Sequence, residues 1–138
     1  MITQIIPIQH QLSKTASFYT LAPMDFSAWD IVTMNLRVEA ITGSPTSASL
    51  KATAETREPW DAELDRWVTI AAPLTTPEGD ILTEITQNTI GPQTYAKIVL
   101  KNGVDFSKYV RFYFEMSFVG GSTPGWTSTI NLSVASAY

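Results

Sequence analysis

Apolar and polar residues alternate along three segments of the chain, and this alternation is the strongest pattern in the sequence. In residues 31–40 every second residue is apolar, and the same period recurs in residues 109–119 and 130–134. Successive side chains of an extended strand point to opposite faces, so such a segment buries one face and exposes the other. The pattern therefore predicts a half-buried β-strand in each of these segments.

Shorter apolar runs between clusters of Gly, Pro and Ser predict further strands. These runs are residues 18–21, 49–56, 67–71, 81–86 and 96–101. Residues 59–65 could form one helical turn, because a proline stands at the first position and acidic residues follow near the start. Short strands separated by turn signals are typical of an all-β fold. We predict an antiparallel β-sandwich or jelly roll of about eight strands, with at most one short helical turn.

The length of 138 residues suits one domain, and the first part of the chain differs in pattern from the rest. Residues 24–138 form the predicted β-sandwich domain. Residues 1–23 are predicted to be an N-terminal strand or an arm, because they lack a clean period. Four apolar side chains in this segment are candidates for contact with a partner, namely Ile2, Ile5, Ile6 and Ile8. A strand would pack into the same sandwich, whereas an arm would reach a neighbouring subunit.

One short motif occurs twice, each time before a strongly alternating strand. Residues 25–29 read Asp-Phe-Ser-Ala-Trp and residues 105–109 read Asp-Phe-Ser-Lys-Tyr. We expect Asp and Ser to hydrogen-bond nearby backbone amides, and Phe26 and Phe106 to close one end of the sandwich. Each strand then runs into a turn rich in Gly, Ser and Pro, at residues 43–46 and 120–125. Internal symmetry and repeated use of one turn type both explain this motif.

Composition and charge exclude several classes of function. The chain has no cysteine and one histidine, which excludes a disulfide scaffold, a thiolate metal site and a histidine-rich metal centre. A net charge of −4 argues against nucleic-acid binding, which needs a basic surface. The first residues carry no basic segment before a long apolar run, and no apolar run approaches the ~18 residues that span a bilayer. We therefore expect neither a secretion signal nor a membrane segment.

No arrangement of residues in the sequence predicts catalysis. The nucleophile elbow, the phosphate-binding loop, the dinucleotide fingerprint and the zinc-protease pair are all missing. The acidic residues 61, 63 and 65 alternate as in a calcium loop, but Arg66 stands where the turn glycine belongs and Ala72 where the bidentate glutamate belongs. We therefore predict a protein that is not an enzyme and that uses neither a cofactor nor a metal ion.

The four tryptophans are the remaining candidates for a binding site. Trp29 and Trp67 lie in or beside predicted strands, so we expect them to pack in the core. Trp60 and Trp126 lie in predicted loops, where an exposed indole would contact a protein partner or stack on a sugar ring. These two residues are therefore predicted interface residues, together with the N-terminal isoleucines.

The order of turns and strands resembles that of small β-sandwich virion proteins of tailed bacteriophages, which include head decoration (cement) proteins. The resemblance rests on Phe-Ser-Ala-Trp at residues 26–29, Gly-Ser-Pro-Thr at 43–46, Arg-Trp-Val at 66–68 and Gly-Gly-Ser-Thr-Pro at 120–124. It covers residues 24–135. The chain departs from the pattern in a longer, more acidic loop between Thr56 and Trp67, and in residues 1–20.

The resemblance implies a structural virion protein, more specifically a capsid decoration protein that binds and stabilises the head. Its implied partner is the major capsid protein, its implied state a homo-oligomer and above all a trimer, and its implied place the capsid exterior after synthesis in the host cytoplasm. Two alternatives stay open. One is a carbohydrate- or receptor-binding β-sandwich module, and the other is a different structural component of a phage tail or baseplate.

Overall fold

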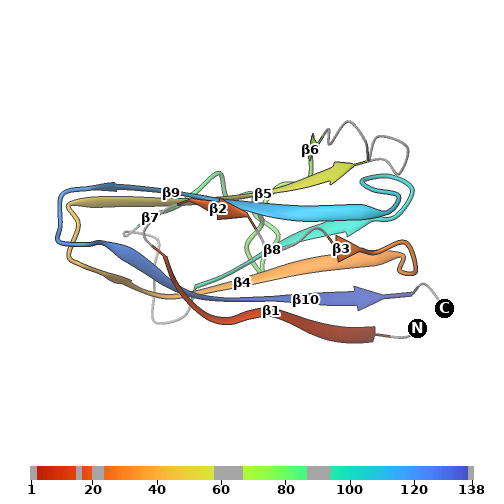
Figure 1. Ribbon diagram of the computed structural model, residues 1–138, viewed down its shortest axis with the longest axis horizontal. Helices are drawn as coiled ribbons and strands as arrows, with labels where there is room; N and C mark the ends of the chain where they lie inside the picture. Colours follow the sequence, from red (N-terminus) through yellow and green to blue (C-terminus); the bar gives the residue numbers. More distant parts are fainter. Residues whose placement is uncertain (1–2, 15–16, 20–23, 58–66, 87–93, 137–138) are drawn as a thin grey trace.

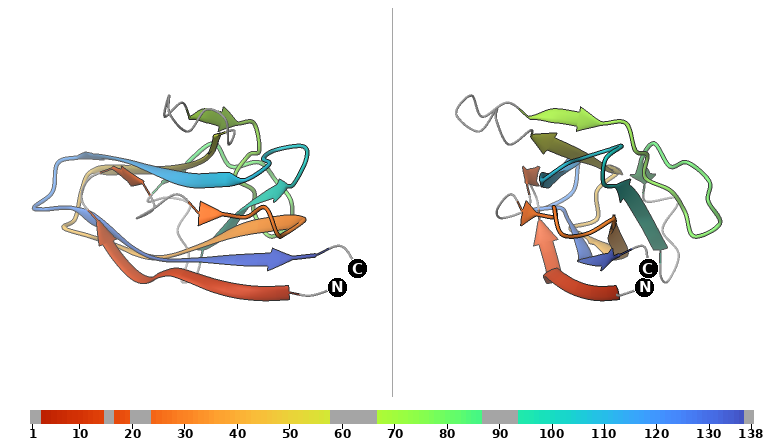
Figure 2. Two further views of the ribbon diagram at one scale, coloured as in Figure 1. Left: turned by 45° about the vertical axis from the view of Figure 1, so that its right-hand side comes forward. Right: turned by 90° about the vertical axis from the view of Figure 1, so that its right-hand side faces the viewer.

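The computed structural model describes residues 3–14, 17–19, 24–57, 67–86 and 94–136, which form ten β-strands and no helix. The strands form two antiparallel sheets that face each other (Figures 1 and 2). Their bounds are β1 Thr3–Lys14, β2 Phe18–Tyr19, β3 Met24–Asp25, β4 Ile31–Thr42, β5 Ser47–Arg57, β6 Val68–Ile70, β7 Ile85–Thr86, β8 Thr94–Lys101, β9 Tyr109–Val119 and β10 Gly125–Ala135.

The order of the strands is that of a jelly roll. One sheet has the order β1-β10-β4-β8, and the other has the order β2-β9-β5-β6, with β3 paired to β9 and β7 paired to β5. The chain crosses between the sheets from β4 to β5 and again from β9 to β10. Because β4 pairs with β10 and β5 pairs with β9, these two crossing connections run side by side (Figure 1). Two antiparallel sheets linked in this way are characteristic of the jelly roll.

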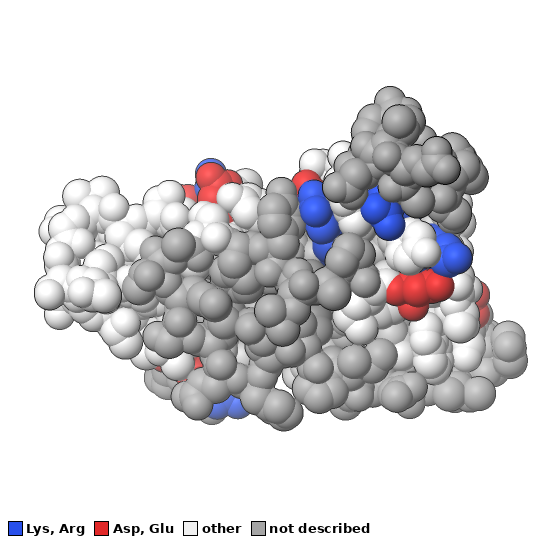
Figure 3. Space-filling model, in the orientation of Figure 1, with Lys and Arg blue, Asp and Glu red and all other residues white. Residues whose placement is uncertain are grey.

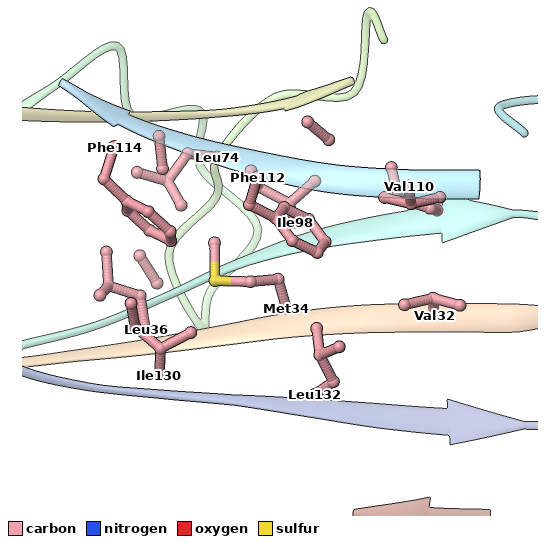
Figure 4. Packing of buried hydrophobic residues seen from close by; sticks show 14 of the residues in the cluster. Val32, Met34, Leu36, Leu74, Ile98, Val110, Phe112, Phe114, Ile130 and Leu132 are labelled. Atoms are coloured by element: carbon pink, nitrogen blue, oxygen red, sulfur yellow. The ribbon is translucent and has the colours of Figure 1, made fainter. Parts of the chain in front are cut away.

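The core lies between the sheets and comes from the alternating strands. Phe112 and Phe114 of β9 point across the sandwich toward Met34 of β4 and Leu132 of β10 (Figure 4). The intervening residues face outward, as period two requires. The predicted all-β class and the three strongly predicted strands are confirmed, and these strands extend one to five residues beyond the predicted bounds at one end or are matched in full. The predicted helical turn at residues 59–65 lies outside the described residues.

The first strand forms one edge of the four-stranded sheet. β1 pairs with β10 from Thr3↔Ala135 to Lys14↔Trp126, with register shifts after Pro7 and after Gln9. A proline and irregular register are both common on edge strands, because they discourage further pairing. Of the two predicted alternatives for this part of the chain, a strand of the sandwich is therefore what residues 3–14 form.

The segment 71–86 closes the sandwich beside the opposite edge strand, β8 (Figure 2). Thr75 exchanges two backbone hydrogen bonds with Lys97 of β8, at 2.8 and 2.9 Å. Leu74 and Ile85 are buried in the core, and Ile85 pairs with Leu50 of β5. The segment thus links the edges of both sheets and covers the apolar residues between them.

The repeated Asp-Phe-Ser motif closes one end of the sandwich, as predicted. Phe26 and Phe106 are 2% and 3% exposed, and their rings meet edge to face with centroids 6.4 Å apart. The two copies differ in their polar contacts. Asp25 accepts hydrogen bonds from the backbone N–H and the hydroxyl of Ser27, whereas Asp105 accepts one from the backbone N–H of Lys101.

Asp25 should make stability depend on pH in the acid range. The hydroxyl and the backbone N–H of Ser27, together with the charge of Lys108, lower the pKa of the Asp25 carboxyl below its ordinary value of 3.8. A lowered folded-state pKa stabilises the fold above the ordinary value, and the contribution disappears as pH falls through the lowered pKa. We expect Asp25→Asn to be less stable than wild type at pH 7 and equal to it in strong acid, as measured by urea unfolding at several pH values. A difference that grew toward acid would contradict this assignment.

Candidate functional site

The two crossing connections lock together through their backbones at one end of the sandwich. We call residues 43–46 and 120–124 the crossover tip. The N–H of Ser122 donates to the carbonyl of Gly43 at 2.8 Å, and the N–H of Thr46 donates to the carbonyl of Val119 at 2.7 Å. A Cβ atom on Gly43 would lie 2.5 Å from the backbone oxygen of Ser122, and one on Gly121 would lie 2.7 Å from that of Gly43. Only glycine allows this approach.

Two residues of the crossover tip adopt a backbone conformation that their side chains disfavour. Ser44 has a φ of 50° and Thr123 a φ of 48°, both in the left-handed region. This region is rare for residues other than Gly, Asn and Asp, and a β-branched threonine is a clear exception. Such conformations persist only where the surrounding structure fixes them, and they concentrate at binding and catalytic sites. The backbone hydrogen bonds between the two loops supply that constraint.

The crossover tip carries no charged side chain. The sequence has no Asp, Glu, Lys or Arg in residues 40–50 or 116–138, and Figure 3 shows this end of the molecule without either charge colour. Val119 extends the surface with an apolar side chain that is 61% exposed. The opposite end of the same face carries several Lys and Arg side chains (Figure 3). The charge of the protein is therefore distributed away from the crossover tip.

A polar pocket of about 310 Å³ opens next to the crossover tip, on the outer face of the β5–β9 sheet. Its lining residues are Ser47, Ala48, Ser49, Glu84, Thr86, Ser117 and Val119. Glu84 is the only charged residue among them, and its carboxylate accepts a hydrogen bond of 2.7 Å from the Ser49 hydroxyl. A carboxylate surrounded by hydroxyl groups suits a cationic side chain of a partner.

Trp126 is buried, so the prediction that it lies in an exposed loop is wrong. It is the second residue of β10 and is 1% exposed. Its ring faces that of Phe118 with centroids 6.4 Å apart. The loop signals before residue 125 end one position earlier than the prediction assumed, and the inward register of β10 places the indole under the turn. Trp126 therefore supports the crossover tip from inside and has no exposed ring face to offer to a ligand.

The other predicted tryptophans occupy different surroundings. Trp29 packs against the core as predicted. Trp67 instead lies with the outward-facing cations, because the guanidinium carbons of Arg111 and Arg57 sit 4.2 and 5.1 Å from its ring centroid. Arg111 also forms an ion pair with Glu55 at 2.7 Å. Period two shows that residues 55, 57 and 111 face outward, but it does not predict that a tryptophan covers them. Trp60 lies outside the described residues.

The predicted N-terminal interface residues belong largely to β1. Ile5 pairs with Ser133 and Ile6 with Leu132, while Ile8 falls at a register shift. Ile2 lies outside the described residues. The predicted role of these four isoleucines in a partner interface stays a prediction.

A second, smaller pocket lies on the outer face of the other sheet. It has a volume of about 220 Å³ and is lined by Asn35, Pro77, Tyr95, Ala96 and Lys97. The sequence gave no sign of this pocket, because Pro77 reaches it from the connection between β6 and β7. Its surroundings are considered further below.

Two searches of the described residues return nothing. No three His, Cys, Asp or Glu side chains in that part of the chain are grouped so that they could hold a metal ion. No helix in the described ranges is long and apolar enough to cross a membrane.

The comparisons with known proteins give no family. No family model matches the chain, and no curated protein matches it in sequence. Among solved structures, the xylan-binding CBM22-1 domain of Xyn10C from Paenibacillus barcinonensis is similar with a TM-score of 0.44 and 8% identity, over 98% of this chain and 95% of that domain. A chain of turnip yellow mosaic virus has a TM-score of 0.31 and 11% identity, over 98% and 81% of the two chains. Both similarities are low, so the description of the fold rests on the strand order of this chain.

Proposed function

We propose that this protein is a structural virion protein of a tailed bacteriophage, and specifically a decoration protein that binds the outside of the head. The observation that carries the proposal is the crossover tip. The two Gly-Ser-Pro turns that underlie the sequence resemblance lie 74 or more residues apart in the chain, yet they form one continuous, backbone-locked surface. The proposed partner is the major capsid protein, and the proposed state is a homo-oligomer, with a trimer favoured.

The crossover tip has the physical properties of a protein-docking surface. Its backbone is fixed before binding, so little conformational entropy is lost when a partner binds. Its lack of charge avoids the cost of removing ions from water at the centre of an interface. The neighbouring pocket would receive a basic side chain of the partner through Glu84. A protein that binds only the assembled shell stabilises that shell by mass action and needs no reactive group for this role.

A charge placed on the crossover tip should prevent binding to heads. We expect Val119→Asp to weaken co-sedimentation with purified phage heads by about tenfold or more, because the interface would bury an unpaired carboxylate. The matched control is Val104→Asp. Val104 is 79% exposed and follows β8 at the opposite end of the sandwich, so this variant should bind like wild type.

The outcomes separate the proposal from its alternatives. A protein found only in tails or baseplates would contradict the decoration role while leaving a virion role. Equal loss of binding in both valine variants would contradict docking through the crossover tip. Binding to immobilised glycans but not to virions would favour the carbohydrate-binding alternative, for which Trp126 has no exposed ring face.

A further inference from the structure

We infer that the pocket beside Tyr95 binds one uncharged sugar ring. This inference does not rest on the proposed function, and it concerns the outer face of the β4–β8 pair rather than the crossover tip. We call the pocket lined by Asn35, Pro77, Tyr95, Ala96 and Lys97 the Tyr95 pocket. It combines an exposed aromatic ring, one hydrogen-bond acceptor and one donor.

The walls of the Tyr95 pocket are fixed before any ligand arrives. Lys97 is paired with Asn35 of β4 on one side and with the backbone of Thr75 on the other. Pro77 belongs to a tight turn, in which the N–H of Thr76 donates to the carbonyl of Asp80 at 2.8 Å and the N–H of Gly79 donates to that of Thr76 at 2.9 Å. A pocket that keeps its shape loses little entropy on binding.

The polar groups of the Tyr95 pocket suit a hydroxyl group. The Asn35 Nδ2 atom donates to Asn131 Oδ1 and to Ser133 Oγ of β10, both at 3.1 Å. This turns the amide NH₂ toward β10 and leaves Asn35 Oδ1 as an acceptor on the side of β8. Lys97 supplies the donor, since its ammonium group makes no ion pair with a described residue. A sugar hydroxyl both donates and accepts, so it can bond to both groups at once.

Tyr95 supplies the apolar surface that the C–H face of a sugar ring requires. Its side chain is 45% exposed and stands beside Arg37 of β4. An aromatic side chain provides a large, rigid contact area, and its hydroxyl leaves one edge polar. The volume of about 220 Å³ is below the ~300–1,000 Å³ of pockets for drug-sized ligands, which favours a single ring.

The charges around the Tyr95 pocket favour an uncharged ligand over an anion. Arg37 is paired with Glu39 at 3.1 Å. Glu78 and Asp80 lie on the same turn as Pro77, and they offset the charge of Lys97. An anion such as phosphate would meet no net positive field at this site.

The test is a titration of the ¹⁵N-labelled full chain with D-glucose, D-galactose, D-mannose and N-acetyl-D-glucosamine, with D-glucuronate and inorganic phosphate as charged probes. We expect at least one neutral sugar to shift the backbone amide signals of residues 95–97 and 35 with a dissociation constant on the order of millimolar. Tyr95→Ala should weaken that binding about tenfold or more. The matched control is Tyr113→Ala, on the outer face of the opposite sheet, which should leave the affinity unchanged.

Each other outcome would overturn the inference. Absence of shifts with all four neutral sugars, or wild-type affinity in Tyr95→Ala, would exclude the site. Tighter binding of glucuronate or phosphate, lost in Lys97→Met, would assign the pocket to anions instead. Unchanged amide signals far from residue 95 show that each variant is folded, so a loss of binding in Tyr95→Ala reports on the pocket.

Discussion

Replacing Phe114 by alanine should cost about 3–5 kcal/mol of unfolding free energy, the range measured for large aromatic side chains in protein cores. Phe114 is 1% exposed and lies between the sheets, beside Leu36 and Leu74 (Figure 4). Truncation would leave a cavity at the centre of the core, where close-packed neighbours relax only in part. Urea unfolding followed by tryptophan fluorescence measures this loss.

The neighbouring residue provides the control for Phe114. Tyr113 is half-buried on the outer face of β9, so Tyr113→Ser should cost about 1 kcal/mol or less. Equal losses at the two positions would mean that the outer face of β9 is also covered, as in an oligomer. Mass photometry of the isolated protein would then show more than one copy, and the proposed trimer would gain support.

Gly43→Ala should be the most damaging change at the crossover tip, with a loss of about 2–5 kcal/mol. Two effects contribute. Alanine in a left-handed conformation costs ~1–2 kcal/mol, and Gly43 has a φ of 81°. The added Cβ would also lie 2.5 Å from the Ser122 carbonyl oxygen and 2.7 Å from the Cα of Pro124, and overpacking costs ~1–3 kcal/mol.

Gly79→Ala separates the two effects in the same measurement. Gly79 has a φ of 93°, but nothing lies within 4 Å of the position of an added Cβ. It should therefore lose only the conformational part, ~1–2 kcal/mol. If both alanine variants lost the same amount, the close approach of the two loops would contribute nothing to stability. If Gly43→Ala still folds, it should also bind phage heads more weakly than Gly79→Ala.

Period two carried most of the fold, because sheet geometry alone dictates which residues of β4, β9 and β10 are buried. The repeated Asp-Phe-Ser motif likewise placed Phe26 and Phe106 at one end of the sandwich. The pairing of strands was not predictable, since it depends on contacts between residues far apart in the chain. For that reason the sequence showed two turns at residues 43–46 and 120–125 without showing that they meet.

The candidate site was predicted less well than the fold. Trp126 was assigned to a loop because Gly and Pro precede it, but one residue of register decides whether a strand residue faces the core or solvent. The pocket beside Tyr95 escaped prediction for another reason. Its wall comes from Pro77, and nothing in the local sequence shows that the segment 71–86 folds against β8.

The arrangement of the two ends of the sandwich has a practical consequence. The start of β1 and the end of β10 are paired, at Thr3↔Ala135, and they lie far from the crossover tip (Figure 1). A fluorescent protein or an affinity label fused to either terminus would therefore point away from the surface that we assign to the capsid. If that assignment is right, such fusions would display their cargo outward from the particle, and the same chain would serve as an adaptor for coating phage heads.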